Sequence, residues 1–256
     1  MNNRINTLFE TKKSNILSIY FTAGYPALED TMTILKNLNT AGVDLVEIGI
    51  PFSDPLADGP VIQNSSEQAL RNGMTVAKLF DQLENIRQTV HIPIILMGYL
   101  NPVMRYGIEA FIAKCSEIGI DGIILPDLPM DYYLSHFKAP CERYNVKNIM
   151  LISNDTSIKR VREIDEQTNG FIYLVSSNGT TGSNKSLETQ QDYYKHIQGL
   201  ELKNPILIGF GVRDKQTYEL TNQYSSGAII GTAFMKHINE QGIDVSSIQS
   251  FINSIR

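Results

Sequence analysis

Two carboxylates in the first quarter of the chain have the character that proton-transfer chemistry needs. Glu47 lies within the apolar run 45–51, which reads as a buried strand, and Asp58 follows on a Pro-rich loop. Burial of an ionised carboxylate is so costly that the group either finds partners or keeps a proton through a raised pKa. A carboxyl group in that state can serve as a general acid or base. The residues alone leave a second interpretation open, in which Glu47 pairs with a basic residue or caps a loop and Asp58 forms a turn with Gly59.

Glycines in the last quarter of the chain predict a site for an anion. Gly209 and Gly211 follow one apolar run, and Gly231 and Thr232 follow the next. Bare backbone N–H groups and a helix N-terminus can donate to a phosphate. Glycine also simply permits tight turns, but two successive occurrences favour a phosphate site. The segment 179–182 after an earlier run is a candidate third arm.

Eight short apolar runs predict the strands that position these residues. They cover residues 16–21, 45–51, 93–99, 122–125, 148–152, 171–175, 205–208 and 227–230. Helical patterns cover residues 5–13, 28–39, 65–71, 76–90, 108–118, 131–144, 158–167, 214–223 and 245–255. Strands that alternate with helices favour a parallel sheet covered by helices. Eight such units predict a closed (β/α)₈ barrel with an extra N-terminal helix, and an open doubly wound sheet is the main alternative.

No Pro/Gly/Ser-rich linker, low-complexity tract or repeat divides the chain, so we expect one catalytic domain over residues 1–256. In a barrel of this kind the active site lies at the carboxyl ends of the strands and on the loops that follow them. The loop that carries Asp58 is longer than the about two to six residues that usually join a strand to its helix. Long loops of this type are often functional.

The composition excludes several classes of function. Lys and Arg number 22 against 27 Asp and Glu, and the net charge of -5 provides no global field to attract nucleic acid or an anionic membrane. We find neither a signal peptide nor an apolar run of the about 20 residues that a membrane span needs, so we expect a cytoplasmic protein. The four histidines, Cys115 and Cys141 lack metal-ligand spacing, so we expect no metal site and reduced thiols.

Three further patterns narrow the chemistry. The chain contains no P-loop and no complete Gly-x-Gly-x-x-Gly motif, which argues against nucleotide or dinucleotide binding. None of the eight expected strands contains a lysine, which disfavours a Schiff-base aldolase. Tyr20, Tyr173 and Phe210 lie at or near expected strand ends, where they are candidates to line an apolar pocket for an aromatic substrate.

Residues 45–60, Leu-Val-Glu-Ile-Gly-Ile-Pro-Phe-Ser-Asp-Pro-Leu-Ala-Asp-Gly-Pro, resemble almost residue for residue the signature of the tryptophan synthase alpha chain family. The similarity continues at residues 101–103, 122–129, 209–211 and 231–232. It implies a (β/α)₈ barrel and a lyase of tryptophan biosynthesis. That lyase cleaves indole-3-glycerol phosphate to indole and glyceraldehyde 3-phosphate by a retro-aldol reaction without a cofactor.

The resemblance also implies a role for each residue of the site. Glu47 would protonate indole C3 and then accept the substrate hydroxyl proton, and Asp58 would stabilise positive charge on the ring nitrogen. Thr181 would meet the Asp58 loop when that loop closes. The other matches are to positions around the substrate (Tyr173, Phe210) and around its phosphate (Gly182, Gly211, Gly231, Thr232).

The implied partner is the tryptophan synthase beta chain, which binds pyridoxal phosphate, in an αββα heterotetramer. The segments 51–60 and 101–106 are where the family docks. Two alternatives remain open: another phosphosugar-binding barrel enzyme such as an isomerase, or a non-catalytic activator of the beta chain. The latter would require the loss of a carboxylate, and both are present.

Overall fold

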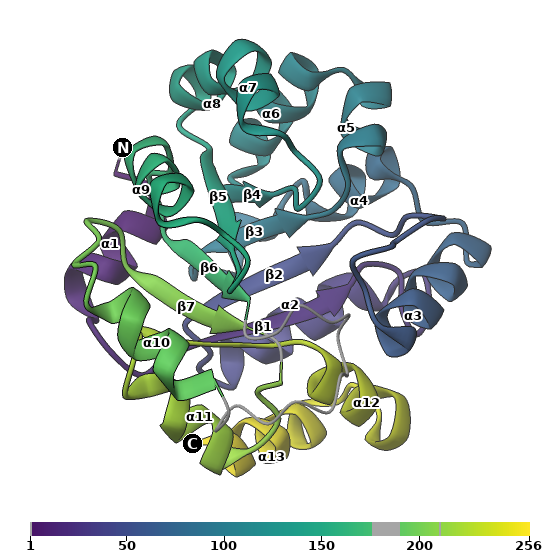
Figure 1. Cartoon of the computed structure of the whole chain (residues 1–256). Coiled ribbons are helices and arrows are strands. Elements are labelled where there is room, and N and C mark those ends of the chain that lie inside the picture. The colour runs from purple at the N-terminus through teal and green to yellow at the C-terminus, as the bar shows by residue number, and fades with distance from the viewer. Residues whose placement is uncertain (1, 176–189, 210) are drawn as a thin grey trace.

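Eight parallel strands close into a barrel with helices around it (Figure 1). The computed structural model of the protein describes residues 2–175, 190–209 and 211–256. The strands follow one another around the barrel in chain order, and β8 closes the ring by pairing with β1. They are β1 Ile16–Thr22, β2 Leu45–Gly49, β3 Ile94–Met97, β4 Gly122–Ile124, β5 Lys147–Ile152, β6 Ile172–Val175, β7 Ile206–Gly209 and β8 Gly227–Ile230. The closed barrel with its N-terminal helix is confirmed, and the open sheet is wrong.

The helices lie on the outside of the barrel, apart from α1 at one end. They are α1 Arg4–Thr11, α2 Asp30–Thr40, α3 Pro60–Arg71, α4 Val76–Leu83, η1 Ile86–Gln88, α5 Leu100–Tyr106, α6 Ile108–Ile118, α7 Met130–Tyr132, η2 Tyr133–Phe137, α8 Lys138–Tyr144, α9 Ile158–Gln167, α10 Gln191–Gln198, α11 Lys215–Asn222, α12 Thr232–Gln241 and α13 Val245–Ile255. The sequence did not predict α5, α10 or α12. The expected helix 131–144 is three segments with a π-helical middle, because Pro140 has no N–H to donate to the carbonyl one turn earlier.

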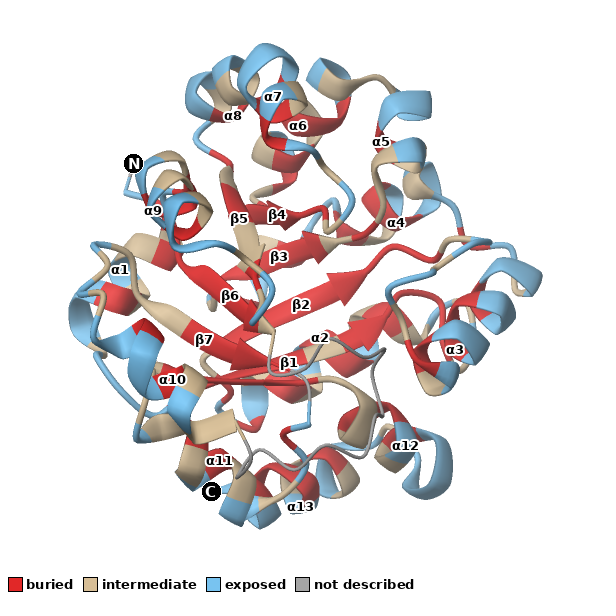
Figure 2. Cartoon of the chain, viewed as in Figure 1, coloured by how far each residue is buried: buried red, intermediate tan, exposed pale blue. Residues whose placement is uncertain are grey.

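The alternation of side chains along the strands creates two apolar layers, and the strands are buried along most of their length (Figure 2). The outer layer lies between the strands and the helices and contains residues such as Ile19, Ile48 and Leu35. The inner layer takes a residue from each strand or its immediate start, and α1 closes it with Ile5 and Phe9. Its barrel members are Ile16, Leu45, Ile95, Ile124, Ile149, Phe171, Tyr173, Leu207 and Ile229. The interior of the barrel is therefore a packed core, and its amino end is plugged.

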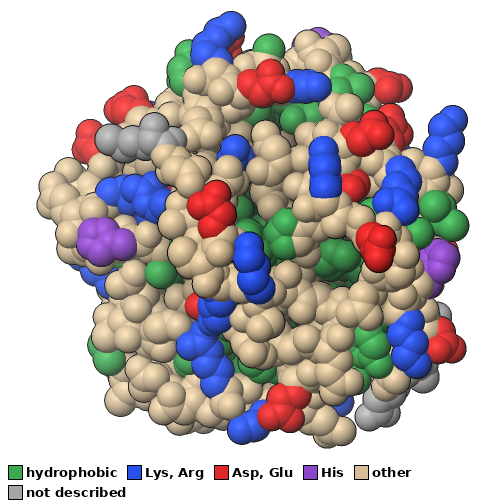
Figure 3. Space-filling view, turned by 90° about the vertical axis from the view of Figure 1, so that its left-hand side faces the viewer, with side chains coloured by type: hydrophobic (Ala, Val, Ile, Leu, Met, Phe, Trp, Pro, Cys, Tyr) green, Lys and Arg blue, Asp and Glu red, His purple; other side chains and the backbone are tan. Residues whose placement is uncertain are grey.

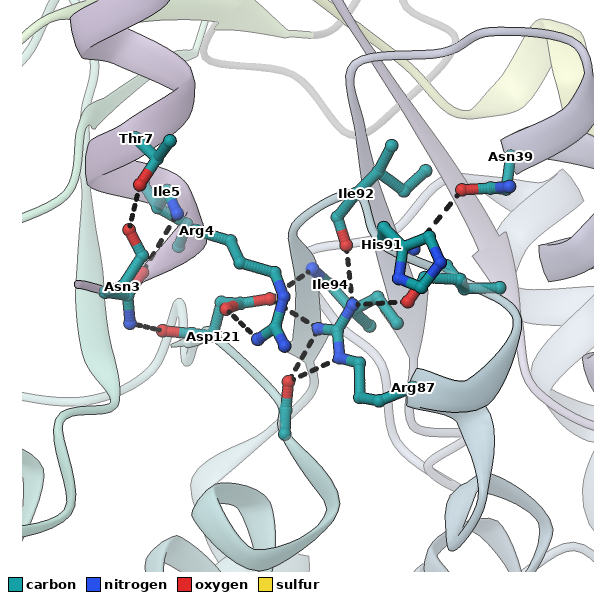
Figure 4. A network of polar contacts seen from close by, with 12 residues as sticks. Asn3, Arg4, Ile5, Thr7, Asn39, Arg87, His91, Ile92, Ile94 and Asp121 are labelled. Atoms are coloured by element: carbon teal, nitrogen blue, oxygen red, sulfur yellow. Dashed lines mark hydrogen bonds and ion pairs between the residues drawn. The ribbon is translucent and has the colours of Figure 1, made fainter. Parts of the chain in front are cut away.

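A polar network fixes α1 against that end of the barrel (Figure 4). Asp121, which is 3% exposed, accepts from Arg4 Nη1 at 3.1 Å, from Arg87 Nη2 at 2.5 Å and from the Ile94 N–H at 2.9 Å. The Asn3 amide donates to the Asp121 carbonyl at 2.9 Å. The bonds join the segment before β4 to α1, η1 and β3. The interior of the barrel is therefore open to a substrate only from the carboxyl ends of the strands in the described part of the chain.

β5 begins at Lys147, so one strand does contain a lysine, contrary to expectation. Lys147 pairs with Gly122 at the amino end of the sheet, and burial lowers its pKa. Its strand runs away from it toward the carboxyl end, where the carboxylates lie. Lys147 is therefore remote from the candidate site.

The charges on the surface, the lengths of the helices and the state of the two cysteines can be compared with what the composition predicted. On the face that carries α1, acidic side chains are interspersed with Lys and Arg (Figure 3). None of the helices in the described part of the chain has the length and apolar character of a membrane span. Cys115 and Cys141 are both buried and free, as expected for reduced thiols.

Candidate active site

A cavity at the carboxyl ends of the strands brings most of the expected site residues together. It encloses about 470 Å³ of space, its open mouth included. Its walls are Tyr20, Glu47, Asp58, Ile62, Met97, Tyr173, Gly211, Val212, Ile229, Gly231 and Thr232. Three expected site residues, Thr181, Gly182 and Phe210, lie outside the described residues.

Glu47 projects from the middle of β2 into the barrel and is fully buried. In the register it lies between Tyr20 on β1 and Ile95 on β3. Its Oε1 accepts a hydrogen bond from the Ser18 hydroxyl at 2.9 Å, whereas its Oε2 has no hydrogen-bond partner among the described residues. Burial raises the pKa of Glu47 to about 8, against the lowering effect of the Ser18 bond. At neutral pH the side chain is therefore largely a carboxylic acid.

The interpretation in which Glu47 pairs with a basic residue finds no support in the described part of the chain. No salt bridge in this part of the protein involves Glu47, and the described residues that line the cavity include no Lys, Arg or His. A buried acid that is neither paired nor exposed is costly to the fold, which is the usual mark of a functional group.

Asp58 lies on the loop between β2 and α3 and is half-buried. The Tyr99 hydroxyl donates to Asp58 Oδ2 at 3.1 Å and accepts from the Ala57 N–H at 3.1 Å. The Tyr99 ring stacks on Phe52 with centroids 5.0 Å apart. Burial raises the pKa of Asp58 to about 6, and the Tyr99 bond opposes the increase. Asp58 also forms a turn, as the second interpretation predicted, since its N–H donates to the Pro55 carbonyl at 3.0 Å.

Two tyrosines pack over glycines of the neighbouring strands. A Cβ added at Gly49 would lie 2.1 Å from the Tyr20 hydroxyl oxygen, and one at Gly209 would lie 2.1 Å from that of Tyr173. Burial raises the pKa of both phenols, and the charges of Asp58 and Glu47 raise them further. Tyr20 and Tyr173 are therefore neutral. Gly209, which the sequence analysis grouped with the phosphate glycines, therefore makes room for the Tyr173 ring.

The part of the cavity wall beside Tyr20, at the start of α12, has the features of an anion site. Gly231 is the N-cap of α12 and offers no side-chain cap, and the helix begins at Thr232. The N-terminus of this ten-residue helix thus faces the cavity with its backbone donors and its positive dipole end. Gly211 adopts φ +80°, which glycine reaches without strain. Helix α12, which the sequence did not predict, therefore supports the anion site that the glycines predicted.

Two residues that hydrogen-bond to the carboxylates, Ser18 and Tyr99, were not identified from the sequence. Ser18 lies within an expected strand, but only the register shows that it faces Glu47. Tyr99 ends the expected third strand, and its position at a strand end was the available signal. Within the described ranges, no group of three or more His, Cys, Asp and Glu side chains comes together as metal ligands do.

The comparisons with known proteins agree with this geometry. A family model described as tryptophan synthase alpha chain matches residues 7–253. The chain is 54% identical to the tryptophan synthase alpha chain of Flavobacterium psychrophilum over 254 residues, 99% of each protein. It is also 54% identical to that of Flavobacterium johnsoniae over 257 residues, 100% of each.

Solved structures show the same fold. The tryptophan synthase alpha chain of Legionella pneumophila subsp. pneumophila has a TM-score of 0.87 at 30% identity, with 100% of this chain and 96% of that chain covered. A chain of Mycobacterium tuberculosis tryptophan synthase has a TM-score of 0.89 at 27% identity, with 100% and 97% covered. The resemblance seen in the sequence is confirmed, and the chain belongs to the tryptophan synthase alpha chain family, which cleaves indole-3-glycerol phosphate in tryptophan biosynthesis.

Proposed function

We propose that Glu47 and Asp58 carry out the retro-aldol cleavage of indole-3-glycerol phosphate to indole and glyceraldehyde 3-phosphate. The observation that supports this assignment most directly is the pair of carboxyl groups in one cavity with pKa values near 8 and 6. Two titratable groups whose environments separate their pKa values are suited to opposite tasks. Glu47 enters the reaction as an acid, and Asp58 enters it as an anion.

The proposed steps balance without a cofactor. Glu47 gives its proton to indole C3, which converts the ring to an indolenine and leaves positive charge on the ring nitrogen. The Asp58 carboxylate stabilises that charge. The bond from C3 to the hydroxyl-bearing carbon then breaks, its electrons restore the aromatic ring, and the hydroxyl proton passes to the Glu47 carboxylate. Glu47 ends as the acid with which it began.

The two ends of the substrate differ in polarity, and so do the walls of the cavity. Ile62, Met97 and the rings of Tyr20 and Tyr173 offer apolar contacts to the indole. The wall around Gly211 and the N-terminus of α12 would hold the phosphate, with Gly231 and Thr232 at the helix start. Phe210 would complete the indole side, Gly182 the phosphate side, and Thr181 the closure over Asp58, as the resemblance implies.

We also propose that residues 1–256 act as one catalytic domain in the cytoplasm, without a cofactor of their own, in an αββα complex. The beta chain of that complex would hold the pyridoxal phosphate. Exposed apolar side chains support docking at the two implied segments. Leu56 on the Asp58 loop is 84% exposed, and Met104 on α5 is 47% exposed. Exposed apolar groups of this kind favour contact with a partner.

Indole release from indole-3-glycerol phosphate tests the assignment, with the isolated chain and with a beta chain added. The value of kcat/KM should rise through about pH 6 as Asp58 ionises and fall through about pH 8 as Glu47 loses its proton. Glu47→Gln should reduce cleavage to a small residual rate, and Asp58→Asn should remove the acidic limb together with most of the rate. Full activity of either variant would refute its role, and turnover of a different phosphosugar instead would favour an isomerase.

A further inference from the structure

Ser18 is a polar residue in an otherwise apolar layer of the barrel interior. Along β1, Ile16, Ser18 and Tyr20 alternate with residues of the outer layer, and Ser18 pairs in register with Leu45 on β2 and Ile229 on β8. Ser18 is 0% exposed. A buried hydroxyl among apolar side chains is costly unless it is hydrogen-bonded. The Ser18 hydroxyl meets this need by donating to Glu47 Oε1 at 2.9 Å.

This bond makes the two oxygens of Glu47 chemically different. A serine hydroxyl has a single proton to donate, and Ser18 gives it to Oε1. With Ser18 as the donor, the oxygen of the carboxylic acid that accepts is its carbonyl oxygen, and the acid proton is on the other oxygen. That other oxygen, Oε2, has no hydrogen-bond partner among the described residues, and Glu47 lines the cavity.

We propose that Ser18 is a positioning residue for Glu47, whose hydroxyl anchors Oε1 and leaves Oε2 as the oxygen that exchanges the proton with the substrate. The inference rests on the proposed function, because it assumes that Glu47 transfers a proton. It goes beyond that function by separating the two oxygens and by naming the group that separates them. A long side chain with one oxygen anchored also loses less rotational freedom when the reaction occurs.

The other groups that face Glu47 do not duplicate this role. The titratable groups around it are Tyr20 on β1, Tyr173 on β6 and Asp58 on the loop after β2. β3 presents Ile95 and Met97, and β8 presents Ile229. The phenols are neutral and Asp58 is a carboxylate, so no cation among the described lining residues competes with Ser18 for Glu47.

The test compares Ser18→Ala with Ser18→Thr, which retains the hydroxyl. NMR titration of the ¹³C-labelled carboxyl of Glu47 in the ligand-free protein should give a pKa about one unit higher in Ser18→Ala than in the wild type. In steady-state cleavage, kcat should fall about tenfold with little change in KM, and the basic limb of the pH profile should move upward by about one pH unit. Ser18→Thr should restore both values toward those of the wild type.

Thr221→Val on α11 is the matched control, because it also deletes a fully buried hydroxyl, one that donates only to the Tyr218 carbonyl at 2.8 Å. It should leave the titration of Glu47 unchanged, and circular dichroism checks that each variant is folded. A Ser18→Ala variant with wild-type titration and kinetics would overturn the proposal.

A double-mutant comparison separates this inference from the proposed function. If Ser18 acts through Glu47, Ser18→Ala should have no further effect on the residual rate of Glu47→Gln. The same tenfold loss in both backgrounds would refute positioning. An active Glu47→Gln variant would instead refute the role of Glu47, whatever Ser18→Ala does.

Discussion

The raised pKa of Glu47 should make the free energy of unfolding of the wild type depend on pH above pH 5, and the substitution Glu47→Gln should remove that dependence. Glu47 is fully buried, and burial raises its pKa from 4.5 to about 8. In the unfolded chain the group ionises near pH 4.5, but in the fold it keeps its proton up to about pH 8. Unfolding between these values releases a proton, so the free energy of unfolding falls as the pH rises. The destabilisation is absent below pH 4.5 and complete above about pH 8.

The size of the effect follows from the same interval. At about 1.4 kcal/mol for each pH unit, the separation between 4.5 and about 8 corresponds to at most about 5 kcal/mol above pH 8 and about 3 kcal/mol at pH 7. The replacement amide has no charge and still offers a carbonyl to Ser18. Its NH₂ adds a cost that does not vary with pH, since Oε2 has no partner in the described structure. The diagnostic is therefore the change with pH in the difference between the two proteins.

Urea unfolding at pH 5, 7 and 9, followed by circular dichroism, measures this difference. The stability of Glu47→Gln relative to the wild type should increase steadily from pH 5 to pH 9. Glu240→Gln on the exposed face of α12 is the control, and its difference from the wild type should not change in this way. A Glu47→Gln difference that is constant across the range would refute the raised pKa and, with it, the acid form that the mechanism requires.

Three other substitutions test how the site and the barrel are held. Tyr99→Phe removes the bond to Asp58 but keeps the ring, so kcat/KM should fall about tenfold while stability changes by about 1 kcal/mol or less. Asp121→Asn leaves two arginines without their buried carboxylate and should lower the free energy of urea unfolding by about 3 kcal/mol. Gly49→Ala would force the Tyr20 ring aside, and should cost about 1 to 3 kcal/mol in urea unfolding and most of the cleavage activity.

Each of these predictions has a control in the same chain. Tyr106→Phe and Asp131→Asn alter exposed residues and should leave rate and stability near the wild-type values. Gly199→Ala places a Cβ no closer than 3.4 Å to its neighbours and should fold normally. Activity of Tyr99→Phe equal to that of its control would show that Asp58 is held by other contacts. Stability of Asp121→Asn or Gly49→Ala equal to its control would contradict the network or the packing argument.

The barrel was predictable because local patterns repeat in every unit. A buried parallel strand reads as a short apolar run, and eight of these runs were enough to indicate closure. The position of Glu47 within such a run also identified it as unusual, since a charge there is costly. Whether it faces the interior depends on the register with Tyr20 and Ile95. That register is set by strands far apart in the sequence, where a slip of one residue reverses the face.

The unpredicted helices arise from contacts that are not local. The N-terminus of α5 is held by Asp127, whose side chain accepts from the Leu100 N–H at 2.9 Å. Asp127 follows β4 in the chain, whereas α5 precedes that strand. The start of α12 reads Gly231-Thr232, which resembles a turn as much as a helix start, and α10 carries few apolar residues. Ser18 was missed for the same reason, because its importance depends on a neighbour on the next strand.

The two carboxylates differ in how the fold holds them. Glu47 lies on a strand bonded on both sides and is anchored by Ser18 from β1, so few surface changes can move it. Asp58 lies on a loop and depends on Tyr99, which also holds the Ala57 N–H beside the exposed Leu56. A partner that binds Leu56 would therefore act on Asp58 and leave Glu47 in place. We propose that this difference separates a fixed acid from a carboxylate that a partner can adjust, which would give a beta chain a route to change the rate without rebuilding the barrel.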